Sequence, residues 1–343
     1  MKAIIMAGGE GTRLKAVTGA LPKPMVPLLG RPMMEHILLL LKKHGFDRVC
    51  AALKYRPEDI RGALGDGSRW GVTLEYRVEE QNLGTAGAVK NCLDFIGEDD
   101  VLVISGDTAC DFDLAELWRC HRDSGAAATL ALYRNEAPLS YGLAVTDADG
   151  AIRAFVEKPR WSQVVTDLVN TGIYVLSPRA LSYVPEHQNF DFAKDLFPLL
   201  LEKGELLRGV PMDGYWCDVG SPLSYYRCCV DALEGKLQLQ RGEAFASASK
   251  PAEEEPEEAS DVQLEVPCRS RAALMGALSE WMLELTPDYT DGIRLHAPGY
   301  EVHIAPLPDR SALRIAVNAG DAEFARRLAL SAKDLAKALE GTE

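Results

Sequence analysis

The stretch Lys2-Ala-Ile-Ile-Met-Ala-Gly-Gly-Glu-Gly-Thr-Arg-Leu14 decides the expected fold, because it joins an apolar run to a loop of three glycines and one arginine. A continuous apolar run predicts a strand buried on both faces, as in a parallel sheet covered by helices. Glycines directly after such a strand leave backbone amides open to a ligand. The opening residues therefore predict an α/β protein and a first loop that binds a ligand.

Two familiar glycine-rich loops do not fit this stretch. A phosphate-binding P-loop needs a Lys and a Ser or Thr at a fixed spacing, and these are missing here. A dinucleotide fingerprint needs a third glycine where this chain has Leu14. A tight turn without a ligand remains an alternative when the loop is considered alone.

The chain continues with alternating strand-like and helix-like segments up to residue 235. Val101–Ser105 is a second apolar run, Pro32–His44 has a helical pattern, and Asp47–Leu53 has a strand pattern. Residues 126–176 contain more strand-like segments, so we expect a mixed sheet there.

Composition limits the classes of function. The formal charge of −14 argues against nucleic-acid binding, which needs a basic surface. No apolar run reaches the roughly 18–20 residues of a membrane span, so neither nucleic acid nor membrane is an expected partner. Eight cysteines without a C-x-x-C pair suit reduced thiols, and we expect a cytoplasmic protein.

Three segments follow one another along the chain. Residues 1–235 form the expected first and larger domain, and residues 236–261, with six carboxylates between Pro251 and Asp261, form an acidic flexible linker. Residues 262–343 predict a small α+β domain with a strand, a helix at Ser270–Glu284, three short strands and a last helix from about Asp321.

The stretch Leu21-Pro-Lys-Pro-Met25 favours a phosphate site. Prolines on both sides of Lys23 predict an extended, prearranged segment. An arginine fork at Arg13 and a fixed lysine, beside free amides, suit a polyphosphate. G-G-x-G-T-R-L followed by P-K-P resembles the signature of the sugar-1-phosphate nucleotidyltransferases, the nucleotide-sugar pyrophosphorylases.

The resemblance implies a mostly parallel, mixed Rossmann-like sheet of nucleotidyltransferase (GT-A-like) type, and residue roles at matching positions. Glu80-Gln-Asn-Leu-Gly-Thr-Ala-Gly-Ala88 resembles the family loop that holds the base, although alone it could be an ordinary helix start. The implied catalytic residues are Arg13, Lys23 and Lys158. The implied nucleotide-binding residues are Ala7, Gly8, Gly9, Gly11, Thr12, Gln81, Gly84 and Thr85.

Two carboxylates are candidate ligands of Mg²⁺. Asp107 follows the strand Val101–Ser105, at the sheet edge where open α/β sheets bind ligands. Asp218 lies in Tyr215-Trp-Cys-Asp-Val-Gly220, and two hard oxygen donors beside phosphates are typical of Mg²⁺ sites. Each aspartate alone could instead be a cap or turn residue.

The sugar phosphate has its own expected residues. Val156-Glu-Lys-Pro159 resembles the family's E-K-P, with Glu157 on the sugar hydroxyls and Lys158 on the phosphate. Asn170 lies in the family's N-x-G strand, and Gly142 matches the glycine that lets a hexose approach the backbone. Without the other motifs, Glu157 and Lys158 would suit an exposed ion pair.

The stretches PKPMVPLLGRPMMEHIL, NTGIYVLSP and FDFAKDLFPLLLEKGE resemble bacterial mannose-1-phosphate guanylyltransferases fused to a phosphomannomutase-like region. The tail resembles the last mutase domain but has neither the phosphoserine loop nor the metal loop. This likeness favours GTP and mannose 1-phosphate. Alternatives are glucose 1-phosphate with UTP or dTTP, and a non-catalytic regulator that binds nucleotide sugar. A homodimer is one assembly that the sequence allows.

Overall fold

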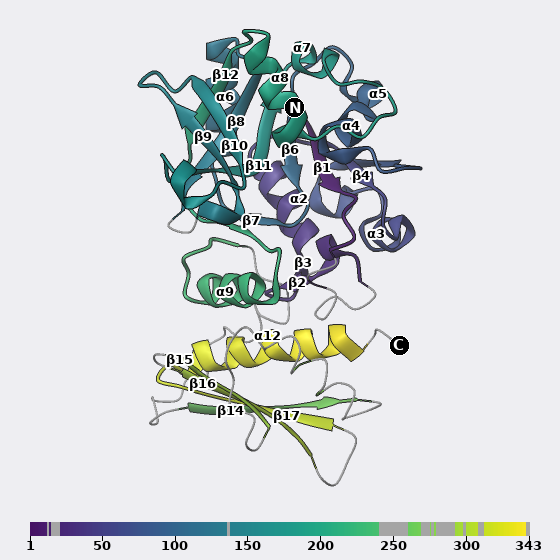
Figure 1. Cartoon of the computed structure of the whole chain (residues 1–343). Helices are drawn as coiled ribbons and strands as arrows, with labels where there is room; N and C mark the ends of the chain where they lie inside the picture. Colours follow the sequence, from purple (N-terminus) through teal and green to yellow (C-terminus); the bar gives the residue numbers. More distant parts are fainter. Residues whose placement is uncertain are drawn as a thin grey trace. The chain divides into compact units, whose positions relative to one another are not determined.

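The chain forms two compact units in the computed structural model (Figure 1): Met1–Glu10 with Ile37–Trp216, and Gly11–His36 with Cys217–Glu343. We call them the first and the second unit. Both are discontinuous in sequence, and the predicted boundaries at residues 235 and 261 stay a prediction. The structure describes residues 1–11, 14, 21–135, 138–239, 260–268, 275, 278, 292–297, 300–307 and 312–340.

Four neighbouring parallel strands form one side of the nine-stranded sheet in the first unit. They are β6 (Val101–Ser105), β1 (Lys2–Ala7), β4 (Arg48–Leu53) and β5 (Thr73–Val78), in this spatial order. β1 and β6 cover the two apolar runs of the sequence, which confirms the prediction of buried strands. Because all four run in the same direction, their carboxyl ends lie at one edge, which we call the carboxyl edge.

The rest of the sheet contains antiparallel neighbours. β11 (Leu168–Leu176) pairs antiparallel with β6, β8 (Ala128–Arg134) and β9 (Gly142–Thr146). β10 (Ile152–Glu157) pairs antiparallel with β9, and β12 (Leu207–Pro211) pairs parallel with β8. The expected mixed, mostly parallel Rossmann-like sheet is thus confirmed.

Helices connect these strands. The predicted helix at Pro32–His44 is α2 (Met33–Lys43). The first unit also contains the helices α3 (Pro57–Leu64), α4 (Gly84–Lys90), α5 (Leu93–Ile96), α6 (Leu114–Ser124), α7 (Pro178–Ser182) and α8 (Phe197–Glu202), the π-helix η6 (Phe192–Leu196) and three short 3-10 helices, η3 (Ser68–Trp70), η4 (Pro138–Ser140) and η5 (Trp161–Gln163). None of the described helices of the chain is both long and apolar enough to cross a membrane.

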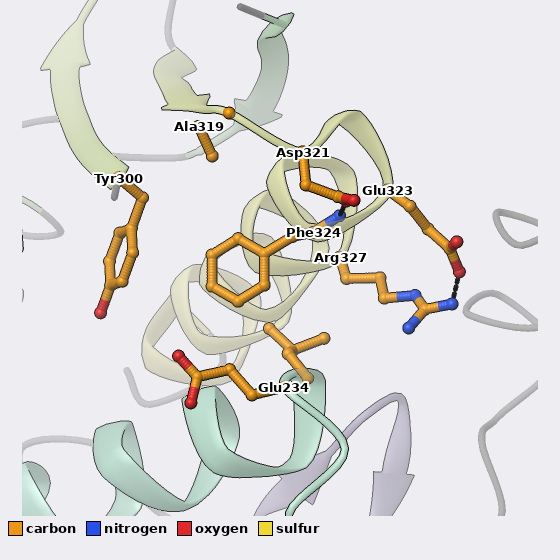
Figure 2. Close-up of a pocket in the computed structure, with 9 residues that line it drawn as sticks. Glu234, Tyr300, Ala319, Asp321, Glu323, Phe324 and Arg327 are labelled. Atoms are coloured by element: carbon orange, nitrogen blue, oxygen red, sulfur yellow. Dashed lines mark hydrogen bonds and ion pairs between the residues drawn. The ribbon is translucent and has the colours of Figure 1, made fainter. Parts of the chain in front are cut away.

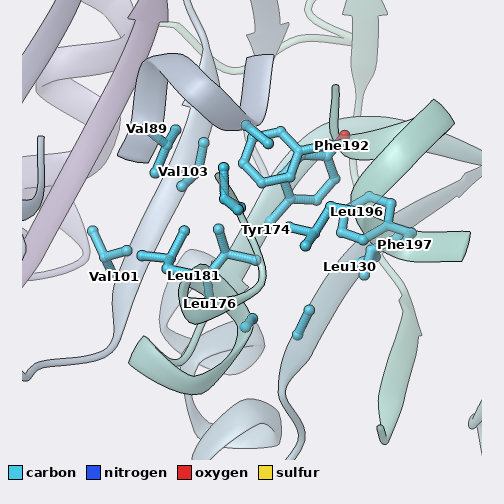
Figure 3. Packing of buried hydrophobic residues seen from close by; sticks show 14 of the residues in the cluster. Val89, Val101, Val103, Leu130, Tyr174, Leu176, Leu181, Phe192, Leu196 and Phe197 are labelled. Atoms are coloured by element: carbon cyan, nitrogen blue, oxygen red, sulfur yellow. The ribbon is translucent and has the colours of Figure 1, made fainter. Parts of the chain in front are cut away.

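An aromatic group lies in the hydrophobic core of the first unit, between β11 and η6. The ring centroids of Tyr174 and Phe192 are 5.0 Å apart, and those of Tyr174 and Phe197 are 5.1 Å apart. All three side chains are nearly or fully buried, and they pack beside Val103 and Leu196 (Figure 3). This packing fixes the start of η6 against the sheet.

The second unit contains a four-stranded antiparallel sheet in the order β14-β17-β16-β15. Its strands are β14 (Ser260–Pro267), β15 (Ile293–Ala297), β16 (Tyr300–Pro306) and β17 (Ala312–Ala319). The predicted strands and the last helix, α12 (Ala322–Glu340), are therefore present. Most of the predicted helix Ser270–Glu284 and most of the predicted linker lie outside the described residues.

A hollow of about 440 Å³ lies in the second unit, between the end of α9 (Pro222–Leu233) and the start of α12. Tyr300 and Phe324 face each other in it, with ring centroids 5.4 Å apart, and Asp321 accepts a hydrogen bond from the backbone of Phe324 (Figure 2). None of the residues that the sequence predicts for the site lines this hollow.

Candidate functional site

The glycine-rich loop begins where β1 ends at the carboxyl edge. Ala7 is buried, and a Cβ on Gly8 would lie 3.0 Å from Oε1 of Glu79 and 3.3 Å from Cβ of Lys54. A side chain at position 8 would thus displace its neighbours, whereas a Cβ on Gly9 would meet nothing within 4 Å. Two predicted residues of this loop, Thr12 and Arg13, lie outside the described residues.

Lys23 lies in the second unit together with Gly11. Gly11 has a φ of +65°, and a Cβ there would lie 3.0 Å from Cβ of Lys23. Nζ of Lys23 lies 3.6 Å from Oδ1 of Asp218, so the predicted phosphate ligand and one predicted metal ligand are an ion pair.

The expectation of an extended segment around Lys23 is wrong in part. Pro22 is extended, with φ −60° and ψ 139°, but Lys23 begins the 3-10 helix η2 (Lys23–Met25). Pro24 fits there because a residue in the first helical turn needs no backbone N–H donor. The prolines therefore prearrange a tight turn and not a straight strand.

The two predicted metal ligands belong to different units. Asp107 follows β6 and accepts a hydrogen bond of 2.6 Å from the hydroxyl of Ser105. Asp218 is the last residue of β13 (Trp216–Asp218). Within the described part of the chain, no group of three or more His, Cys, Asp or Glu side chains could hold a metal ion.

The predicted base loop, residues 80–88, leads from β5 into α4. Gly84 has a φ of +70°, and a Cβ there would lie 2.6 Å from the carbonyl oxygen of Phe190. The side-chain amide of Gln81 donates a hydrogen bond of 2.9 Å to the carbonyl of His187. The hydroxyl of Thr85 donates one of 2.9 Å to Oδ2 of Asp191. The base loop is therefore held by residues about a hundred positions later in the chain.

Gly142 and Glu157 lie side by side on neighbouring strands of the first unit's sheet. They are partners in the register of β9 and β10. A Cβ on Gly142 would lie 2.7 Å from Oε2 of Glu157, so any side chain at position 142 would push this carboxylate aside. The neighbouring Lys158 has a φ of +46°, which is unusual for a residue other than glycine. The two predicted sugar-binding residues therefore lie together.

Burial raises the pKa of Glu157, and the negative charge of Asp191 raises it further. Asn170 lies in β11, where the pairing with β8 shifts register between Asn170 and Tyr174. Oδ1 of Asn170 accepts a hydrogen bond of 3.3 Å from the backbone of Gly172, whose φ is +77°. This bulge sets the direction of Asn170 at the carboxyl edge.

Two carboxylates near the predicted residues were missed in the sequence. Glu79 is buried beside Gly8, and burial raises its pKa. Asp191 accepts a hydrogen bond from Thr85, and its negative charge raises the pKa of Glu157. Glu79 comes directly before the base loop, and Asp191 comes directly before a helix, so each has the sequence position of an ordinary turn or cap residue. Their position near the expected site becomes visible only when segments that are distant in the sequence are seen in contact in the structure.

Comparison with known families identifies the chain. Residues 2–235 match the model of the family described as nucleotidyl transferase. The chain belongs to this family. Its curated relatives include proteins named UTP–glucose-1-phosphate uridylyltransferase and mannose-1-phosphate guanylyltransferase, which confirms the resemblance to sugar-1-phosphate nucleotidyltransferases.

Two bacterial relatives illustrate the similarity. The uridylyltransferase of Synechocystis sp. is 36% identical over 251 residues, which are 69% of this chain and 65% of the relative. The guanylyltransferase of Mycobacterium tuberculosis is 34% identical over 247 residues, 70% of this chain and 68% of the relative. This nucleotidyltransferase thus spans about two thirds of the length of these relatives.

Solved structures show the same fold. The crystal structure of HddC from Yersinia pseudotuberculosis is 30% identical and has a TM-score of 0.59, covering 66% of this chain and 97% of that one. A putative glucose-1-phosphate thymidylyltransferase from Bacillus anthracis is 28% identical and has a TM-score of 0.63, covering 70% and 98%.

Proposed function

We propose that the chain transfers a nucleotidyl group from a nucleoside triphosphate to a sugar 1-phosphate, and that its substrates are GTP and mannose 1-phosphate. The observation that supports this most is the arrangement at the carboxyl edge of the first unit. The loops after β1 and β5 lie there, and so does Asp107 after β6. In β9, Leu143 pairs with Val169 of β11 and Gly142 pairs with Glu157 of β10, so Gly142, Glu157 and Asn170 lie on neighbouring strands.

The reaction is an in-line attack by a phosphate oxygen of the sugar 1-phosphate on the α-phosphorus. A new P–O bond forms, the bond to the bridging oxygen of the β-phosphate breaks, and pyrophosphate leaves. Because the attacking oxygen already carries negative charge, the reaction needs no general base. The protein must instead bring two polyanions together and neutralise the charge that develops.

Positive side chains have separate tasks in this proposal. Arg13 and the loop amides bind the leaving pyrophosphate, and Lys23 holds the triphosphate. Lys158, next to the sugar ligand Glu157, binds the phosphate of the sugar. Asp107 and Asp218 would hold Mg²⁺ through their carboxylates, which are hard oxygen donors. The ion supplies positive charge at the reacting phosphates.

The choice of base and sugar is the finer part of the proposal. The guanylyltransferase of Debaryomyces hansenii is 37% identical and the Synechocystis uridylyltransferase is 36% identical, so identity does not separate them. The stretches that resemble mannose-1-phosphate guanylyltransferases favour GTP, and the HddC relative has also been crystallised with GMP-PN. The Synechocystis relative favours the alternative, UTP with glucose 1-phosphate.

A matrix of pyrophosphate-release assays tests both parts. The full chain is assayed with Mg²⁺ and each of GTP, UTP, dTTP and ATP, combined with mannose, glucose or N-acetylglucosamine 1-phosphate. We expect the highest kcat/KM with GTP and mannose 1-phosphate. A preference for UTP or dTTP with glucose 1-phosphate would keep the reaction and change the substrates. No release with any pair, from a folded protein that binds nucleotide, would support a non-catalytic regulator.

A further inference from the structure

The base loop is hydrogen-bonded to a segment to which none of the sequence motifs assigns a role. We call residues His187–Asp191 the bracing segment. The carbonyl of Phe190 accepts hydrogen bonds from the backbone of Ala86, at 2.9 Å, and of Gly87, at 3.0 Å. The N–H of Phe190 donates to the carbonyl of Leu83 at 2.9 Å. These are bonds between backbone groups, so the bracing segment fixes the course of the base loop independently of most side chains.

Asp191 makes two kinds of contact through its two oxygens. Oδ1 accepts hydrogen bonds from the backbone of Ala193, at 3.0 Å, and of Lys194, at 3.2 Å, and so caps η6. Oδ2 accepts the hydroxyl proton of Thr85, whose oxygen in turn accepts from the backbone of Phe192 at 2.9 Å. The hydroxyl proton of Thr85 is thus committed to Asp191 in this structure. Thr85 therefore holds the loop, whatever else it contacts.

Asp191 also acts through its charge on Glu157, a residue of the expected sugar side. Burial raises the pKa of Glu157 and the charge of Asp191 adds to this, whereas Lys158 and Lys194 act in the opposite direction. Burial also raises the pKa of Tyr174, and the negative charges of Asp191 and Glu157 raise it further. One carboxylate thus interacts both with the loop expected to hold the base and with the carboxylate expected to bind the sugar.

We propose that Asp191 is a positioning residue that couples the two substrate sites, since it holds Thr85 of the base loop by a hydrogen bond and caps η6, which contacts β10, the strand that ends at Glu157. This inference rests on the proposed function for the identity of the two sites. Loss of the hydrogen bond would weaken triphosphate binding. Loss of the charge would change the pH range in which Glu157 can accept hydrogen bonds from sugar hydroxyls.

Three substitutions separate these effects. Asp191→Ser keeps a good helix cap but removes both the charge and the partner of Thr85. Asp191→Asn keeps the cap and the shape and removes the charge. Thr85→Val removes the hydroxyl and leaves the charge of Asp191 in place. All three are studied in the full chain, with the substrate pair that gives the fastest pyrophosphate release.

Two readouts are expected to move separately. Asp191→Ser and Thr85→Val should each raise the KM for the triphosphate about tenfold, the size expected for one lost hydrogen bond to a charged group.

In Asp191→Ser and Asp191→Asn, the acid limb of kcat/KM for the sugar phosphate should shift to lower pH. The reason is that a lost negative neighbour makes Glu157 easier to ionise. Thr85→Val should leave this limb in place. The titration of the sugar phosphate itself is common to all variants.

Asp113→Ser is the matched control. Asp113 caps α6 by accepting hydrogen bonds from the backbone of Ala115 and Glu116, and it has no contact with the base loop among its described hydrogen bonds. Its loss should cost stability without moving either readout. If the Asp191 variants behave like this control while the wild-type chain is active, Asp191 is only a helix cap and the inference fails. If the wild-type chain releases no pyrophosphate with any pair, the proposed function fails instead.

Discussion

The base loop and the segment Leu21–Met25 both contain expected ligands of the nucleotide or its phosphates, but the two segments are held in place in different ways. The base loop is tied through backbone and side-chain hydrogen bonds to residues 187–192, far away in sequence. The segment around Lys23 forms its own turn, in which the N–H of Met25 donates to the carbonyl of Pro22 at 2.8 Å. Lys23 then pairs with Asp218 through charge.

This difference explains why one region was easier to predict from the sequence than the other. Prolines and a lysine are visible in a short motif, which predicted a prearranged local segment, although the extended course expected for Lys23 was wrong in part because Lys23 begins η2. The partners of the base loop depend on which strands and loops become neighbours. A short motif therefore predicts which groups are present, but not which distant segment holds them.

The largest effects are expected where charge carries the chemistry. Asp107→Asn and Asp218→Asn should each lower kcat by at least about 10²-fold, the range for losing a preorganised charge stabiliser. Asp218→Asn also weakens the ion pair with Lys23. Stopped assays at saturating Mg²⁺ measure this. Asp94→Asn, an exposed aspartate paired with Arg77, is the control and should retain kcat within about twofold. Near-normal turnover in either variant would remove that residue from the site.

The next effect concerns the backbone ties of the base loop. Gly84→Ala should raise the KM for the triphosphate by roughly tenfold or more and destabilise the fold by about 1–3 kcal/mol. Its positive φ disfavours alanine, and the new Cβ would lie 2.6 Å from the carbonyl oxygen of Phe190. Gly62→Ala in α3 is the control, since a Cβ there meets nothing within 4 Å. Equal KM values in the two variants would mean that the loop does not depend on this close approach.

A smaller effect is expected from losing the hydrogen bond that anchors the segment after Lys23. The hydroxyl of the buried Tyr225 donates a hydrogen bond of 2.5 Å to the carbonyl of Pro27. Tyr225→Phe should cost about 1–3 kcal/mol of stability and raise the KM for the triphosphate several-fold, because the segment that Tyr225 anchors carries Lys23, the proposed triphosphate ligand. Tyr226→Phe, which loses a hydrogen bond with Tyr300, should lose stability alone. A rise in the KM for the triphosphate of the same size in both variants would argue against a specific effect through Pro27.

The smallest effect is a pH dependence of stability near the same segment. Nε2 of the buried His36 forms a hydrogen bond of 2.7 Å with the carbonyl of Leu28. Burial is the main reason that the pKa of His36 is lowered from 6.5. Below about pH 6.5 the unfolded chain therefore binds a proton that the folded chain does not, and stability falls as the pH falls.

The variant His36→Gln keeps a hydrogen-bond donor but cannot titrate. Its urea midpoint should decrease less than that of the wild-type chain when the pH is lowered from about 7 to about 5.5. Burial also lowers the pKa values of His44 and His121. Both remain in the two proteins, so the difference between the midpoints isolates His36. Parallel pH profiles would show that His36 does not contribute.

The sequence predicted the parts of the fold whose causes are local. β1 and β6 lie where apolar runs predicted them, and α2 lies within the predicted helix. The pairing of Gly142 with Glu157 could not be predicted, because strand register depends on the whole sheet. The bracing segment was missed for a related reason. Its contacts with the base loop are made largely by backbone groups, which every residue has, so no side-chain motif marks them.

Amide hydrogen exchange tests most directly whether the base loop and the bracing segment form one nucleotide-binding element. Exchange of the full chain is measured with Mg²⁺ alone and with the triphosphate that gives the fastest pyrophosphate release. We expect Ala86, Gly87 and Phe190, whose backbone groups bond to one another across the two segments, to become slower together when the triphosphate binds. Sugar phosphate alone should not slow them. Saturating triphosphate that slows neither segment, or only one of them, would contradict the account.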